Sequence, residues 1–287
     1  MKTEQLTKNV FVKTETRGCN FGYVVTSEGV VLIDAPGDIT YVEEYSKELA
    51  KIGKMRYIIN TEYHFDHNMT NGYFDTPVIA SEITKSLILT TNTNQSMKQS
   101  TQALYAEPFT VPSPKIYKRG IPSITFSEKM TINLGKHTFQ IILLPGHTAG
   151  QTAVYIPEEK VIFASDNVMA SGVIGPLHDA VPYQYLKSLE FLKSLDARYI
   201  QTGHGELLKT NIKSCLNSLS ASLKERIKAV EKFKADGLNV AQASELWEKM
   251  FPFKPFPKSE GYRDYSPAFG TMVLTHLYEV IGGNAGI

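Results

Sequence analysis

Short runs of apolar and β-branched residues alternate with turn residues through the first two thirds of the chain. Their length and composition predict β-strands. The runs cover residues 9–13, 21–25, 30–35, 55–60, 77–81, 123–127, 130–134, 137–145, 152–157, 160–165 and 198–202. Apolar residues at helical spacing predict helices over 41–52, 82–90 and 182–195. Strands and helices therefore share one α/β domain, which we place at 1–206.

After residue 205 the pattern becomes helical. Leucine, isoleucine and valine recur every three or four residues from Leu208 to Val230, and Gly237 is a stop signal. Two shorter amphipathic stretches follow at 245–251 and 269–280. We expect 207–287 to form a helical C-terminal extension packed on the same domain. The polar, proline-punctuated residues 91–121 are expected to be a lid-like insertion.

Composition narrows the possible partners. The 287 residues are 42% hydrophobic and 21% charged, with a formal net charge of +1. This balance gives no basic surface for nucleic acid and no reason to expect a membrane partner. The first residues lack the apolar core of a signal peptide, and the two cysteines suggest no disulfide framework. We expect a cytoplasmic protein with a small-molecule substrate, and a homodimer stays open.

Potential metal ligands follow four of the expected strands. Glu62, His64, Asp66 and His67 come directly after the strand at 55–60. One potential ligand follows each of three later strands: His147, Asp166 and His204. We call the whole set the seven-residue cluster: Glu62, His64, Asp66, His67, His147, Asp166 and His204. Gathered on one edge of a sandwich, these nitrogen and oxygen donors suffice for two divalent cations that share one carboxylate. Zinc is the first choice, with iron or manganese as alternatives.

The remaining histidines receive other interpretations. His137 and His276 are expected to be structural, whereas His178 could face the cluster and contact substrate. Tyr262 and Arg263 offer a further polar and aromatic substrate-binding patch.

The order of these motifs resembles the metallo-β-lactamase superfamily, whose signature is H-x-H-x-D-H followed by separate His, Asp and His motifs. The likeness covers about residues 9–206 and includes "GVVLIDAPGD", "LPGHTAGQTAVYI" and "TGHGE". It implies an αβ/βα sandwich of two mixed sheets, four layers deep, with metals at one edge.

The resemblance also assigns each ligand to one of two metal ions. It implies a first metal held by His64 and His147, with Glu62 where the family has histidine. It implies a second metal held by Asp66, His67 and His204, bridged to the first by Asp166. An aspartate at the bridging position favours the glyoxalase-II-like or lactonase-like branch, since true β-lactamases usually carry Cys or Ser there. The lactonase tyrosine is absent, because Met169 stands near that place.

Two cations could hold a hydroxide near neutral pH, and this predicts hydrolysis of an ester, thioester, lactone or amide bond. Asp66 is the candidate catalytic residue, orienting the hydroxide or passing its proton to the leaving group. Three alternatives stay open: an iron-dependent, dioxygenase-like oxidative enzyme, β-lactam hydrolysis, and a non-catalytic binding protein. We expect Glu62 to be a real ligand that lowers the charge of the site. The alternative is that Glu62 swings away and leaves the first site weak.

Overall fold

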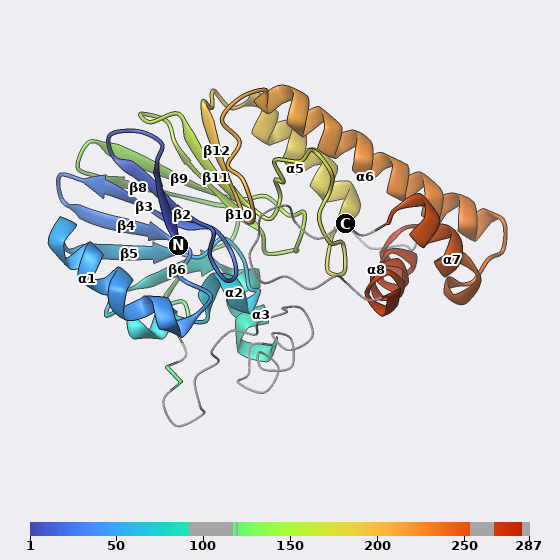
Figure 1. The fold of residues 1–287 in the computed structure, drawn as a ribbon, viewed down its shortest axis with the longest axis horizontal. Helices are drawn as coiled ribbons and strands as arrows, with labels where there is room; N and C mark the ends of the chain where they lie inside the picture. The colour runs from blue at the N-terminus through green and yellow to red at the C-terminus, as the bar shows by residue number, and fades with distance from the viewer. Residues whose placement is uncertain (92–116, 119, 253–266, 283–287) are drawn as a thin grey trace.

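The computed structural model describes residues 1–91, 117–118, 120–252 and 267–282, and its strands form two sheets (Figure 1). The larger sheet has seven strands in chain order, and the smaller has five in the order β12-β11-β10-β9-β8. The larger sheet contains β1 (Lys2–Gln5), β2 (Val10–Thr14), β3 (Phe21–Thr26), β4 (Gly29–Ile33), β5 (Met55–Ile59), β6 (Val78–Ser81) and β7 (Ile124–Phe126). The smaller contains β8 (Lys129–Leu134), β9 (His137–Leu143), β10 (Thr152–Ile156), β11 (Val161–Ser165) and β12 (Tyr199–Thr202).

Both sheets are mixed, as the resemblance implies. In the larger sheet β1 to β4 pair antiparallel, and β4 to β7 pair parallel. In the smaller sheet β11 and β12 are parallel, and β8 to β11 are antiparallel. Two consecutive antiparallel pairings make β9 run in the same direction as β11 and β12. The carboxyl ends of these three strands therefore lie at one edge of the smaller sheet.

Helices cover the outer faces of the two sheets, while apolar side chains fill the space between them. Val31 and Ile33 of β4 and Phe163 of β11 belong to the buried cluster between the sheets. On the outer face of the larger sheet, α1 (Val42–Ile52) buries Tyr45 and Leu49 completely. Each such side chain contributes about 1.5–3 kcal/mol by leaving water. The αβ/βα sandwich is thereby confirmed.

The outer face of the smaller sheet carries α5 (Pro182–Ser194). Against α5 packs the first of the described C-terminal helices, which extend away from the sheet (Figure 1). These are α6 (Ile212–Ala235), α7 (Val240–Met250) and α8 (Pro267–Val280). Leu219 of α6, Trp247 of α7 and Leu274 of α8 join one buried cluster with Ile200 of β12. The division of the chain at residue 206 stays a prediction. Among the described helices, none combines the length and apolar character needed to cross a membrane.

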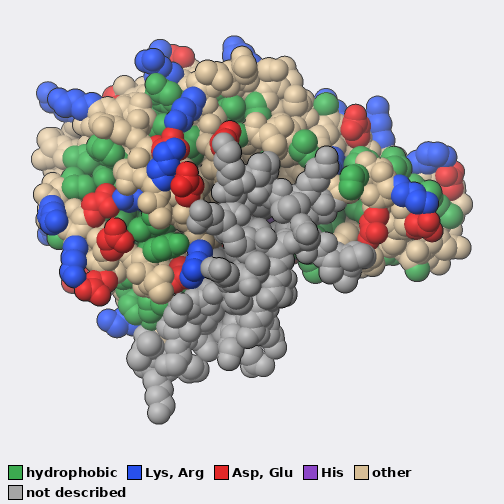
Figure 2. All heavy atoms as spheres, in the orientation of Figure 1, with side chains coloured by type: hydrophobic (Ala, Val, Ile, Leu, Met, Phe, Trp, Pro, Cys, Tyr) green, Lys and Arg blue, Asp and Glu red, His purple; other side chains and the backbone are tan. Residues whose placement is uncertain are grey.

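The structure differs from the sequence prediction at the start of α6 and at β1. Leu208 continues the helical spacing, but it forms a β-bridge with Ile200, and α6 begins only at Ile212. The polar strand β1 is not predicted, because an exposed edge strand carries no buried face to reveal it. The expected insertion at 91–121 lies almost entirely outside the described residues. On the face shown in Figure 2, acidic and basic side chains are interspersed over the described surface.

Candidate metal centre

Strand direction brings the seven-residue cluster to one place. β5 leads into Glu62 and then α2 (Phe65–Asn68), which carries Asp66 and His67 and lies at the centre of the view in Figure 1. In the smaller sheet, His147 follows β9, Asp166 follows β11 and His204 follows β12. Strand-end loops held by a rigid sheet keep side chains in fixed positions, which a metal site requires.

Two glycines make room for the ligand loops. A Cβ at Gly203 would lie 1.6 Å from Asp166 Oδ1, so only glycine allows the β12 loop to pass this carboxylate. A Cβ at Gly146 would lie 2.2 Å from Asn167 Oδ1, the atom that accepts a hydrogen bond from the backbone N–H of His147 at 2.8 Å. Both glycines therefore serve close packing of the strand ends around the cluster.

The cluster separates into two triads. Donor atoms of Glu62, His64 and His147 lie within 4.8 Å of one another. Donor atoms of Asp66, His67 and His204 form a second such group. These are the same two sets that the resemblance implies for the first and second metal.

Asp166 lies between the two triads. Its Oδ1 is 3.4 Å from His67 Nε2, and its Oδ2 is 3.3 Å from His204 Nε2 and 3.6 Å from His147 Nε2. Two ligands on one tetrahedral ion, each bonded at about 2.0–2.1 Å, are about 3.4 Å apart. The separations around Asp166 match that spacing, so its carboxylate can contact one ion in each triad.

Three histidines are held so that Nε2 faces the cluster. His67 Nδ1 donates to Asp34 Oδ2 at 3.0 Å, His147 Nδ1 to Pro176 O at 2.9 Å, and His204 Nδ1 to Gly18 O at 3.2 Å. Each acceptor holds the Nδ1 side of the ring, so Nε2 is the atom that would bind a cation.

His64 is held the other way round. Its Nε2 lies 3.2 Å from Asp179 Oδ2, and its Nδ1 lies 2.9 Å from Glu62 Oε1. The Tyr63 hydroxyl donates to the same Asp179 oxygen. Asp179 accepts the Nε2 proton, so Nδ1 is the ring atom of His64 that would bind a cation.

Sequence reasoning missed Asp34, Asp179 and Tyr63. Asp34 was detectable, because it follows the buried strand β4 as the other cluster residues follow theirs. It also accepts hydrogen bonds from the Thr61 N–H and hydroxyl, at 2.8 and 2.6 Å. Asp179 gave no such signal, since it lies in the long loop between β11 and α5.

His178 lies beside the first triad. Its ring centroid is 5.2 Å from that of His64 and 5.8 Å from that of His147. Burial, reinforced by the neighbouring His64, lowers the pKa of His178 to about 3. His178 is therefore neutral at physiological pH, and its role in substrate binding stays a prediction.

Carboxylates dominate the electrostatics of the cluster. Burial would lower the pKa values of His64 and His67, but both values lie well above the usual one. Nearby carboxylates raise the pKa of His64, and Cys19 together with carboxylates raises that of His67. Burial raises the pKa of Glu62, yet His64 and His67 outweigh it and hold that pKa at about 2. The cluster thus favours positive charge at its centre.

The residues present fit a pair of divalent cations. His67 Nε2 and Asp166 Oδ1 are fully buried and have no hydrogen-bond partner among the described residues. Buried polar atoms are almost always paired, so these two indicate a missing ligand between them. All donors are nitrogen or oxygen, a set that suits zinc, iron or manganese.

Other candidates lie elsewhere. Tyr262 and Arg263 fall outside the described residues. His137 pairs with Glu159 at 2.8 Å, and His276 Nε2 contacts Ala180 O at 2.7 Å, which agrees with structural roles. Both cysteines are buried and free.

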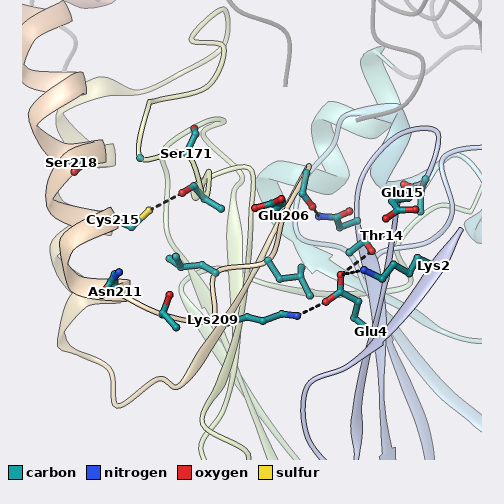
Figure 3. Close-up of a pocket in the computed structure, with 18 of the residues that line it drawn as sticks. Lys2, Glu4, Thr14, Glu15, Ser171, Glu206, Lys209, Asn211, Cys215 and Ser218 are labelled. Atoms are coloured by element: carbon teal, nitrogen blue, oxygen red, sulfur yellow. Dashed lines mark hydrogen bonds and ion pairs between the residues drawn. The ribbon is translucent and has the colours of Figure 1, made fainter. Parts of the chain in front are cut away.

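A polar cavity of about 580 Å³ is lined in part by Glu206 and Lys209, which follow β12 in the chain (Figure 3). Its lining includes Gly18, whose carbonyl contacts His204 Nδ1, and Gly205, the residue after His204. No member of the seven-residue cluster lines it. Lys209 and Lys2 both reach Glu4 on one wall of this cavity. The cavity is therefore separate from the two triads.

Comparison with known proteins places the chain in a family. Residues 14–204 match the family model of the metallo-beta-lactamase superfamily. Among curated relatives, a hydroxyacylglutathione hydrolase of Mesorhizobium japonicum is 31% identical over 159 residues, which are 53% of this chain and 62% of that protein. The corresponding protein of Rhizobium meliloti is 30% identical over 132 residues, 45% of this chain and 51% of that protein. Each match spans less than two thirds of the relative.

Solved structures show the same fold. A metallo-beta-lactamase family protein from Thermus thermophilus aligns with a TM-score of 0.67 at 18% identity, covering 98% of this chain and 96% of that one. A metallo-beta-lactamase from Pontibacter korlensis aligns with a TM-score of 0.60 at 20% identity, covering 78% of this chain and 98% of that one. The family model covers well over half of the chain, and its match includes every member of the seven-residue cluster. The chain belongs to the metallo-beta-lactamase superfamily.

Proposed function

We propose that the protein is a metal-dependent hydrolase that cleaves an acyl bond, with a thioester as the preferred substrate class. The observation that carries the proposal is the pair of triads with Asp166 between them. The buried His67 Nε2 and Asp166 Oδ1 lie 3.4 Å apart, and neither has a hydrogen-bond partner among the described residues. Divalent cations bound there lower the pKa of water and polarise a carbonyl oxygen, which is the chemistry that hydrolysis needs.

The chain's own residues have distinct roles in this proposal. Glu62, His64 and His147 would hold the first cation, and Asp66, His67 and His204 the second. Asp66 is also placed to accept a proton from the attacking water, since its Oδ2 lies at the cluster, 3.5 Å from His204 Nε2. It would then pass that proton to the leaving group.

The choice of a thioester rests on the relatives. Two curated relatives at 30–31% identity are named hydroxyacylglutathione hydrolases. A thiolate leaving group needs less proton assistance than an alkoxide or an amine. Asp66 is the one carboxylate of the second triad, and this single acid–base group is sufficient for such a reaction.

The test is a kinetic panel on the metal-loaded full-length chain. It compares S-acyl thioesters with matched oxygen esters, a lactone, an anilide and a β-lactam. We expect kcat/KM to be highest for the thioester, and Asp66→Asn to lower it on the order of a hundredfold or more. No hydrolysis of any member by the metal-loaded chain would refute the proposal.

An iron-dependent oxidative enzyme is the second candidate. Glu62, fully buried, adds a carboxylate to the first triad, and oxygen-rich sites suit iron and manganese better than histidine-only sites do. Purification without oxygen, followed by metal analysis and an oxygen-uptake assay, separates the two. Iron with substrate-dependent oxygen consumption would support oxidation, whereas hydrolysis without oxygen uptake would support the hydrolase.

A further inference from the structure

Glu62 occupies the position where the family signature has histidine, and it contacts both triads. Its Oε2 is 2.8 Å and its Oε1 2.9 Å from His64 Nδ1, in the first triad. Its Oε1 is also 3.3 Å from His67 Nε2, in the second triad. Donor atoms of Glu62, His67 and Asp166 form a third group within 4.8 Å of one another.

The second of these contacts has the spacing of a shared ion. The Glu62–His67 separation of 3.3 Å equals the His204–Asp166 separation of 3.3 Å across the other carboxylate. Both are close to the distance of about 3.4 Å between two ligands on one tetrahedral ion. Glu62 is completely buried, so its carboxylate cannot turn to solvent.

The chemistry of the side chain explains why the substitution matters. An imidazole offers one nitrogen to one ion, because its other nitrogen carries the proton. A carboxylate offers two oxygens and can bind one ion with each. We propose that Glu62 is a second bridging carboxylate, which joins the first and second metal positions alongside Asp166 and makes this a doubly carboxylate-bridged site. The inference rests on the proposed function only in requiring two metal positions.

A double bridge has a consequence that a terminal ligand lacks. If Glu62 binds only the first ion, its loss weakens the first position and leaves the second unchanged. If it bridges, its loss weakens each position even when the other is empty. Two variants each leave one metal position to be measured. His147→Ala weakens the first position, so binding reports the second. His204→Ala weakens the second position, so binding reports the first.

The experiment measures Zn²⁺ affinity by competition with a chromophoric chelator. It uses the full chain after metal removal, in both backgrounds, with and without Glu62→Gln. Glu43→Gln, at an exposed carboxylate of α1, is the matched control for the loss of one charge. We expect Glu62→Gln to weaken Zn²⁺ binding on the order of tenfold or more in both backgrounds, and Glu43→Gln in neither.

If Glu62→Gln weakens Zn²⁺ binding only in the His204→Ala background, Glu62 is a ligand of the first ion alone. That result would overturn the bridge and leave the proposed function standing. A wild-type chain that binds no Zn²⁺ would overturn both the bridge and the proposed function. Circular dichroism of each metal-free variant checks that it is folded. A crystal structure of the Zn²⁺-loaded wild type decides independently: each Glu62 oxygen should lie about 2.0–2.2 Å from a different ion. Contact with only one ion would refute the bridge.

Discussion

Replacing Asp179 with alanine should weaken binding of the first metal. The Asp179 carboxylate lies 3.2 Å from His64 Nε2 and is the acceptor that would hold the ring with Nδ1 toward the ion. Loss of such an orienting partner typically lowers metal affinity tenfold to a hundredfold, or about 1.4–2.8 kcal/mol. The His64 side chain is 18% exposed, so water can partly replace the lost acceptor. We therefore expect a decrease near the lower limit, about tenfold.

The assay is stepwise Zn²⁺ binding to the metal-free chain, measured by chelator competition. Tyr63→Phe is the matched control, since it removes the other donor to Asp179 but leaves the carboxylate on His64. Asp179→Asn should give an intermediate loss, because its amide oxygen can still accept the proton. Unchanged affinity for both ions in a folded Asp179→Ala variant would refute the role of Asp179.

Three further changes test other parts of the structure. Gly203→Ala places a Cβ 1.6 Å from Asp166 Oδ1 and should abolish metal binding. Gly237→Ala, where a Cβ meets nothing within 4 Å, should retain it. Metal analysis of both proteins tests this, and full metal content in Gly203→Ala would contradict it. Removing the metals with a chelator should lower Tm by roughly 5–10 °C, because the ions bind only the folded chain; an unchanged melting curve would contradict this. Burial raises the pKa of Glu159, but hydrogen bonds from Thr7, Asn9 and His137 outweigh it and lower that pKa. Its ionised form therefore stabilises the fold above the pKa of the unfolded chain, and this contribution is lost as pH falls through the folded pKa. Relative to Glu159→Gln, the wild type should be more stable by about 1 kcal/mol at pH 7 and should lose that advantage as the pH falls below the ordinary carboxyl pKa. A pH-independent difference in urea unfolding would contradict it.

The strand-end ligands could be predicted because local pattern and chain order both indicate them. A buried run followed by a histidine or a carboxylate recurs at β5, β9, β11 and β12, and those strands share an edge only because their directions agree. Asp34 followed the same rule and could have been included.

Asp179 could not be predicted in this way. It lies 115 residues from His64 in a segment without regular structure, so its contact depends on the tertiary course of the loop. The contacts of Glu62 with both His64 and His67 likewise depend on side-chain placement in the folded protein. No periodicity in the sequence encodes that placement.

Metal content per chain tests the central claim most directly. After equilibration with Zn²⁺ and removal of the excess, elemental analysis should find two ions in the wild type. His204→Ala should retain one, with an unchanged circular dichroism spectrum, because His204 Nε2 faces Asp66 and Asp166 on the side of the second position. Fewer than two ions in the wild type, or two ions in His204→Ala, would contradict the two-triad centre.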